Sequence, residues 1–205
     1  VVSGNTGEVE RLYREADALV DAAGAMPRRL PVLRSLASFH LYRGEIDRTL
    51  DIGQQVMRLA EQEDDPRLLL EAHLILGPSL AFVGRAREGL DHLDRAVEMF
   101  DPEGYRSAPF RLGPNPGVAA AAVSALLHFI FGDPRTSEQR AETALDLAAR
   151  LGHPYSLAYG TFHVALLDLW QGRFDRARRR ADEVIAIAGA HQYDIWTAIG
   201  HVLGG

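Results

Sequence analysis

Apolar residues recur with a helical period along the chain, in stretches that are separated by short polar turns. Four glycines each end one such stretch and open the next, at spacings of 40, 48 and 40 residues: Gly44, Gly84, Gly132 and Gly172. Each glycine is followed by a polar helix start. No segment shows the alternating pattern of a β-strand. The pattern therefore predicts an all-α chain whose repeat is a helix, a tight glycine turn and a second helix.

Small residues recur at fixed distances from these glycines, as expected where two helix axes approach closely. The pairs seven residues before and five residues after the glycines are Ala37 and Thr49, Gly77 and Gly89, Ala125 and Ser137, and Ala165 and Ala177. The residues twelve positions after the glycines are Val56, Ala96, Ala144 and Val184, which are all apolar. We therefore predict that each helix pair crosses at its small residues.

These signals place the helices along the chain. First helices are predicted at residues 30–43, 66–83, 116–131 and 154–171, and second helices at 45–62, 85–100, 135–151 and 173–189. Prolines that favour helix starts mark the unit boundaries: Pro31, Pro66, Pro116 and Pro154. We predict one helical repeat domain over residues 1–205, with a half unit at 7–23, units at 30–62, 66–100, 116–151 and 154–189, and a half unit from residue 194.

Composition narrows the function. The chain has no cysteine, and all 22 of its basic residues are arginine. Thiol chemistry, P-loop and kinase lysines and Schiff-base amines are therefore excluded. The net charge of −6 gives no reason for nucleic acid to bind. The uncharged run 118–131, bracketed by Gly117 and Gly132, is too short to span a membrane. No two of the eight histidines lie three or four residues apart, so no helix presents a metal-binding face. We predict no enzyme activity, no metal and no cofactor.

This pattern of a small residue, a turn glycine and a second small residue resembles the tetratricopeptide (TPR) repeat. The resemblance implies a right-handed α-solenoid of antiparallel helix pairs. The chain departs from the TPR pattern four residues before each glycine, where the usual tyrosine is replaced by His40, Leu80, His128 and Asp168.

A closer resemblance covers residues 66–200. The segments 81–84, 92–102, 115–119 and 151–158 resemble the TPR-rich region of bacterial predicted ATPase signalling proteins, which are linked to adenylate/guanylate cyclase, LuxR-type or kinase domains. The resemblance implies a cytoplasmic, non-catalytic interaction or sensor arm of a signal-transduction ATPase or transcriptional regulator, and a fragment of a longer protein.

Candidate binding residues lie near the ends of the first helices. Two residues before the turn glycines stand Tyr42, Phe82, Ile130 and Trp170, and further candidates are Phe129, Tyr159, Phe162 and Leu166. One interpretation is a groove for a protein or peptide, or for neighbouring domains of the same polypeptide. The other interpretation is core packing. A homodimer is a further alternative for the partner.

The Pro- and Gly-rich connection 101–115 is long for a helix–helix link, and carries Tyr105, Phe110 and Arg111. The following helix, 116–131, has no charged residue and must be buried on all sides. The connection, a second copy, a neighbouring domain or a ligand could cover it. The alternative function is therefore a small-molecule sensor with an apolar pocket under residues 101–115.

Two polar features complete the candidates. The arginines from Arg173 to Arg180 are interpreted as a solvated face with ion pairs to nearby acids such as Asp175 and Glu183. A pair between His163 and Asp168 is the one arrangement that resembles a catalytic constellation, and catalysis is not expected there.

Overall fold

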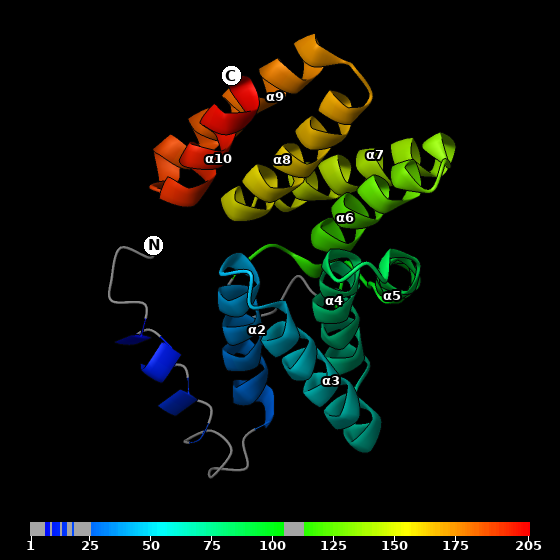
Figure 1. Ribbon diagram of the computed structural model, residues 1–205, viewed down its shortest axis with the longest axis vertical. Helices are drawn as coiled ribbons and strands as arrows, with labels where there is room; N and C mark the ends of the chain where they lie inside the picture. The colour runs from blue at the N-terminus through cyan, green and yellow to red at the C-terminus, as the bar shows by residue number, and fades with distance from the viewer. Residues whose placement is uncertain (1–6, 9, 13, 16–17, 19–25, 105–112) are drawn as a thin grey trace. The chain divides into compact units, whose positions relative to one another are not determined.

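The computed structural model describes residues 7–8, 10–12, 14–15, 18, 26–104 and 113–205 (Figure 1). Within these residues every regular element is an α-helix. The long helices are α2 (Met26–Tyr42), α3 (Ile46–Glu63), α4 (Pro66–Phe82), α5 (Ala86–Met99), α6 (Pro116–Ile130), α7 (Pro134–Leu151), α8 (Pro154–Trp170), α9 (Phe174–His191) and α10 (Asp194–Gly204). In the predicted helix 7–23 the described residues are helical. The chain divides into two compact units, Val2–Leu112 and Gly113–Gly205.

The N-terminal unit contains two antiparallel helix pairs, α2–α3 and α4–α5, and α3 also packs against α4 (Figure 1). Its apolar core joins three helices. The buried residues of this core are Leu33, Leu36, Ala37, Phe39, Ile52, Val56, Ala72 and Ile75. Because α4 contacts α2, α3 and α5, it is the central helix of this unit.

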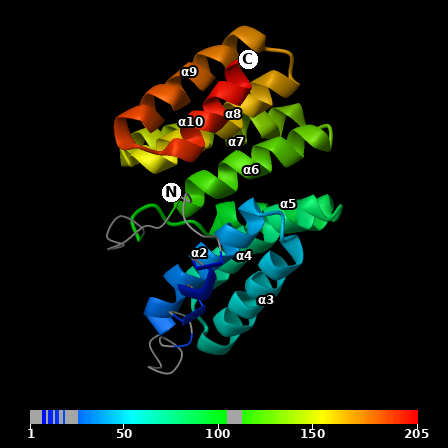
Figure 2. The same cartoon turned by 60° about the vertical axis from the view of Figure 1, so that its left-hand side comes forward.

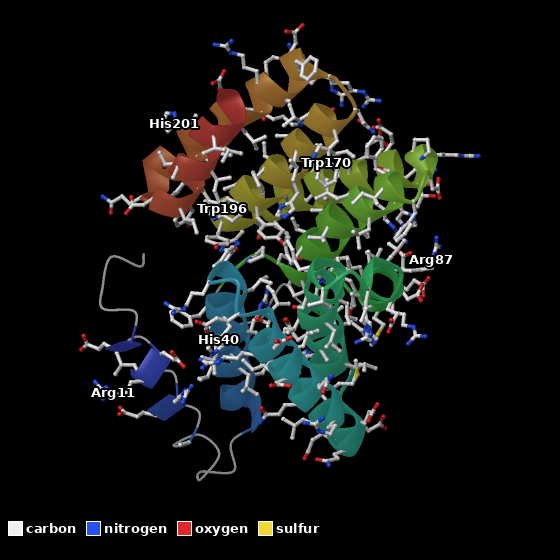
Figure 3. All side chains as sticks on the ribbon, viewed as in Figure 1. Arg11, His40, Arg87, Trp170, Trp196 and His201 are labelled. Carbon is white, nitrogen blue, oxygen red and sulfur yellow. The ribbon has the colours of Figure 1, made fainter. Side chains whose placement is uncertain are left out.

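The C-terminal unit contains the pairs α6–α7 and α8–α9, and α10 packs against α9 and α8 (Figure 2). The buried side chain of Trp196 anchors α10, and Figure 3 labels it at this layer. Its ring contacts Tyr155 and Tyr159 edge to face, with centroids 5.7 and 5.6 Å apart. Helix α10 therefore continues the stacking of helices in this unit.

The four predicted turns share one geometry. The glycines adopt left-handed φ angles of 74°, 82°, 79° and 72° at Gly44, Gly84, Gly132 and Gly172. After each glycine, the next backbone N–H donates to a carbonyl five residues earlier, in the pairs Glu45 to His40, Arg85 to Leu80, Asp133 to His128, and Arg173 to Asp168, at 2.8–2.9 Å. This is the Schellman motif, which satisfies the last carbonyls of the first helix. No atom lies within 4 Å of a Cβ built on these glycines, so backbone conformation and not space requires glycine.

The predicted crossing points are also confirmed. All four small pairs are buried. In the α2–α3 pair the Thr49 hydroxyl donates to the Ala37 carbonyl at 3.4 Å. In the α6–α7 pair Ser137 donates to the carbonyl of Ala125 at 2.7 Å. In the α4–α5 pair, a Cβ on Gly89 would lie 2.4 Å from the carbonyl oxygen of Gly77, so these backbones touch directly.

One predicted helix start is wrong. Helix α2 begins at Met26, so Pro31 lies inside it and does not open it. Proline is tolerated at the first helical position because the N–H there needs no partner. Proline occupies such a position in α4, α6, α7 and α8. At its sixth position in α2, Pro31 removes a hydrogen-bond donor, and its carbonyl accepts a 2.8 Å bond from the Ser35 hydroxyl.

Candidate functional site

The residues two positions before the turn glycines form a set that we call the turn row: Tyr42, Phe82, Ile130 and Trp170. Each is the last residue of its helix, in α2, α4, α6 and α8. Their exposed fractions are 54%, 71%, 56% and 43%. Figure 3 labels Trp170 at the end of α8. Side chains this exposed add little to a core, so core packing does not account for the turn row.

The other predicted groove residues lie deeper. Phe129 and Leu166 pack against the buried cluster that includes Ala125 and Val164. Tyr159 and Phe162 pack against Trp196, and the ring centroids of Phe162 and Trp196 are 5.5 Å apart. These four half-buried side chains stabilise the C-terminal unit, whether or not they also bind a partner.

Helix α6 is buried at every residue from Pro116 to Ala122, as its lack of charge predicts. Asn115 caps it: its side-chain carbonyl accepts from the backbone N–H of Gly117 at 3.0 Å, and its own N–H donates to the Ser156 hydroxyl at 2.8 Å. The predicted loop residues Tyr105, Phe110 and Arg111 lie outside the described residues. The apolar pocket under this connection therefore stays a prediction.

A first cleft, which we call the histidine cleft, lies on α3, α4 and α5 and has a volume of about 500 Å³. Its lining residues are Met57, Glu61, Leu69, His73, His92, Arg95, Glu98 and Met99. The Nδ1 atoms of His73 and His92 are 2.7 Å apart, so one ring donates a hydrogen bond to the other. Burial lowers the pKa of His73 to about 4 and also lowers the pKa of His92, so both rings are neutral at pH 7.

The histidine cleft was missed by sequence reasoning, which searched for histidines three or four residues apart on one helix. His73 and His92 are 19 residues apart and lie on different helices. In the described part of the chain, no group of three or more His, Asp or Glu side chains is placed to hold a metal ion.

A second cleft, which we call the arginine cleft, lies between α7 and α9 and has a volume of about 280 Å³. It is lined by Leu145, Arg176, Arg179, Arg180 and Glu183. The two clefts occupy related positions in the repeat. Met57 and Leu145 both follow their turn glycine by thirteen residues, and His92 and Arg180 follow theirs by eight.

Beside the arginine cleft, the buried carboxylate of Asp168 binds three arginines of the turn and of α9. Its oxygens contact Nη1 of Arg180, Nε of Arg176 at 3.3 Å and Nη1 of Arg173 at 3.7 Å. Arg173 also pairs with Glu138 of α7. The expected ion pairs are therefore present, but three of these arginines bind a buried acid of the preceding helix, which the sequence analysis did not name as their partner.

The suggested pair between His163 and Asp168 is not formed. His163 Nδ1 bonds the backbone carbonyl of Tyr159 at 2.8 Å, and the two rings stack with centroids 4.1 Å apart. Burial lowers the pKa of His163 to about 4. Asp168 binds arginines instead, so these two side chains do not form the constellation that the sequence suggested.

A further buried carboxylate belongs to the N-terminal unit. Glu71 of α4 binds Nη1 of Arg34 of α2 at 2.8 Å. Its second oxygen is buried without a hydrogen-bond partner. Desolvation raises the pKa of Glu71, and the charge of Arg34 opposes that shift.

No protein-family model and no curated protein matches this chain. None of the described helices is long and apolar enough to cross a membrane.

The fold is similar to solved structures of helical repeat proteins. BtubC (BKLC) from P. vanneervenii is 16% identical, with a TM-score of 0.62, and the match covers 90% of this chain and 72% of that one. A signal transduction ATPase with numerous domains (STAND) with a tetratricopeptide repeat sensor, from Pyrococcus horikoshii, is 14% identical, with a TM-score of 0.60. That match covers 96% of this chain and 30% of the ATPase.

A third similar structure contains nearly identical TPR-like repeats from a Podosopora anserina kinesin light chain. It is 18% identical, with a TM-score of 0.54, and the match covers 92% of this chain and 89% of that one. The predicted fold class, an all-α solenoid of TPR-like repeats, is therefore confirmed.

Proposed function

We propose that this chain is a non-catalytic scaffold that binds a protein or peptide through the turn row. The observation that carries the proposal is the exposure of large apolar side chains at one position in all four repeats. Exposed apolar side chains at equivalent repeat positions are a common basis of protein recognition. Within each unit, the TPR-like helix pairs can present such side chains to an extended or helical segment.

The finer proposal is that the scaffold is the cytoplasmic sensor arm of a bacterial signal-transduction ATPase or transcriptional regulator. Two observations support it: the resemblance of residues 66–200 to such proteins, and the similarity of almost the whole chain to a STAND protein with a TPR sensor. Partner binding would act by favouring one position of the arm relative to its ATPase. The partner would be another protein, a peptide or a domain of the same polypeptide.

The turn row can be tested by site-specific photocrosslinking in cells of the source organism. A photoreactive phenylalanine analogue replaces Phe82 or Trp170, and the matched control places it at Phe174, which is 67% exposed but belongs to a second helix. We expect crosslinks to one partner from the turn row and not from the control. Equal crosslinking from all three positions, or none from the turn row, would contradict the proposal.

The Ala variants of Phe82 and Trp170 supply the second readout. Both variants should abolish capture of the crosslinked partner. Phe82→Ala should change the free energy of unfolding by less than about 0.5 kcal/mol, because its side chain is 71% exposed, whereas Trp170→Ala should cost more because Trp170 is only 43% exposed. A large loss of stability in Phe82→Ala would indicate that the turn row has a structural role.

The finer proposal has its own test. An antibody against this chain should detect a native polypeptide several times larger than 22.5 kDa. A band near 22.5 kDa would contradict the proposal that the chain is part of an ATPase, and would indicate a separate adaptor protein. The proposal that the chain is a binding scaffold would not be affected.

A further inference from the structure

The start of α9 carries an unusual concentration of positive charge. Five of the eight residues from Arg173 to Arg180 are arginines, in a chain whose net charge is −6. The N-terminal end of a helix carries a partial positive charge, so Arg173 at the N-cap and Arg176 in the first turn are unfavourable there. Natural proteins depart from such local rules mainly at functional or strained sites.

The arginine cleft collects three of these arginines on one face of α9. Arg176, Arg179 and Arg180 line it together with Leu145 and Glu183. The equivalent positions of α5 are Glu88, Asp91 and His92, and those of α7 are Thr136, Gln139 and Arg140. Among the described second helices, α9 therefore has by far the most basic face at this position.

The buried acid beside the cleft orients the guanidinium groups without neutralising them. Asp168 carries one negative charge and contacts Arg173, Arg176 and Arg180. Each guanidinium has five N–H donors, and the two oxygens of one carboxylate accept only a few of them. Arg179 forms no ion pair or hydrogen bond within the described residues. Arginines held in this way retain donors for another anion.

We propose that the arginine cleft binds a phosphate monoester. Planar guanidinium groups recognise phosphate oxygens with paired hydrogen bonds, and three of them suit a dianion better than a single carboxylate. A cleft of about 280 Å³ accommodates a phosphate group with a small part of the molecule that carries it. The monoester can belong to a small metabolite or to a phosphorylated side chain of a partner, and the experiment separates these sources. This site is independent of the turn row.

The test titrates the complete 205-residue chain with phenyl phosphate, with a phosphoserine peptide and with the same peptide unphosphorylated, at constant ionic strength. The arginine Nε–H resonances in ¹⁵N NMR spectra report binding at individual side chains. We expect the Nε–H resonance of Arg179 to shift with phosphorylated ligands and not with chloride. Binding of both ligands indicates a site open to small metabolites, whereas binding of only the phosphopeptide indicates a protein source.

Two pairs of variants separate a built site from general electrostatics. Arg179→Gln should weaken binding by about tenfold, while Arg178→Gln, which removes the same charge outside the cleft, should weaken it by less than about twofold. Glu183→Gln should strengthen binding, because Glu183 is the one acid among the described residues that line the cleft, whereas Asp182→Asn should not. A gain in affinity cannot result from misfolding.

Circular dichroism and the melting temperature establish that the variants are folded. The proposal is overturned if phosphorylated ligands shift no arginine resonance beyond the effect of chloride. It is also overturned if Arg178→Gln and Arg179→Gln weaken binding equally, or if Glu183→Gln and Asp182→Asn have the same effect.

Discussion

The helix pair α4–α5 of the N-terminal unit and the pair α8–α9 of the C-terminal unit are built on the same turn, with a left-handed glycine and the same two backbone hydrogen bonds. They differ in what fills the space between their helices. In α4–α5 two glycine backbones touch, whereas in α8–α9 two alanines occupy the same positions. The repeat requires two small residues where the helices cross, and either two glycines or two alanines meet this requirement.

The polar residues differ more strongly between the two units. Four residues before the turn, the apolar Leu80 of α4 corresponds to the buried carboxylate of Asp168 in α8. Eight residues after the turn, His92 corresponds to Arg180. The N-terminal unit consequently has a neutral histidine pair at its cleft. The C-terminal unit instead buries the carboxylate of Asp168, which forms ion pairs with arginines. One backbone framework thus supports two electrostatic environments, which is how repeats become specialised.

The largest expected effect concerns the charge that distinguishes the C-terminal unit. Asp168→Asn should lower the free energy of unfolding by about 3 kcal/mol, because it leaves partly buried arginines without their shared carboxylate. Asp175→Asn is the matched control, since this exposed acid precedes the same arginines on α9. Urea unfolding measures both variants. Equal losses would show that Asp168 acts only through general charge balance.

The second prediction concerns the crossing in the N-terminal unit. Gly89→Ala should cost about 2 kcal/mol of stability, because the added Cβ would lie 2.4 Å from the backbone oxygen of Gly77 and the helices must separate. Gly189→Ala in α9 is the control: nothing lies within 4 Å of its added Cβ, and the helix should become more stable by up to about 1 kcal/mol. Calorimetry measures the stability of both variants. If Gly89→Ala is as stable as the unmodified chain, the close crossing of α4 and α5 is contradicted.

The third prediction concerns pH. The pKa of His73 is about 4 in the folded chain, below the usual value of 6.5, so the unfolded chain binds the proton first as the pH falls. The stability that depends on neutral His73 is complete above pH 6.5 and is lost as the pH falls towards 4. His73→Gln should reduce this acid-induced loss, as measured by urea unfolding across that range.

His163 provides the comparison in the C-terminal unit, because burial also lowers its pKa to about 4. Its partner is a backbone carbonyl and not a second histidine. Replacing His73 should therefore also move the titration of His92 in imidazole NMR spectra, whereas replacing His163 should move no other histidine. An unchanged His92 titration would contradict coupling within the histidine cleft.

The smallest expected effect contrasts the two buried acids. Among the described residues Glu71 has one arginine partner, Arg34; its second carboxylate oxygen is buried without a hydrogen bond, and its pKa is raised. Its ionised form therefore opposes folding at neutral pH, and this cost decreases as the pH falls below its raised pKa. Glu71→Gln should change the free energy of unfolding at pH 7 by less than about 1 kcal/mol. If Glu71→Gln loses as much stability as Asp168→Asn, the two buried acids do not differ in their contribution to folding.

The elements that depend on local pattern could be predicted well. The turn glycines and the small residues around them occupy fixed positions in the repeat, so their roles follow from spacing alone. Pro31 shows the limit of such reasoning. The sequence predicted that Pro31 marks a helix start, but α2 already begins at Met26, five residues earlier. The same spacing located the turn row, but it could not predict that these side chains are exposed. An apolar residue at a helix end can lie in a core or on a surface.

The sequence by itself determined the helical class, the four turns and the crossing points, because periodicity, positive φ and close backbone approach restrict which residues can stand at each position. Only the tertiary structure decided which polar groups meet. His73 reaches His92, and Asp168 reaches Arg180, across two helices. Such pairs depend on the rotation and packing of whole helices, which the spacing of residues along one chain does not specify. The division into two compact units was likewise decided in three dimensions.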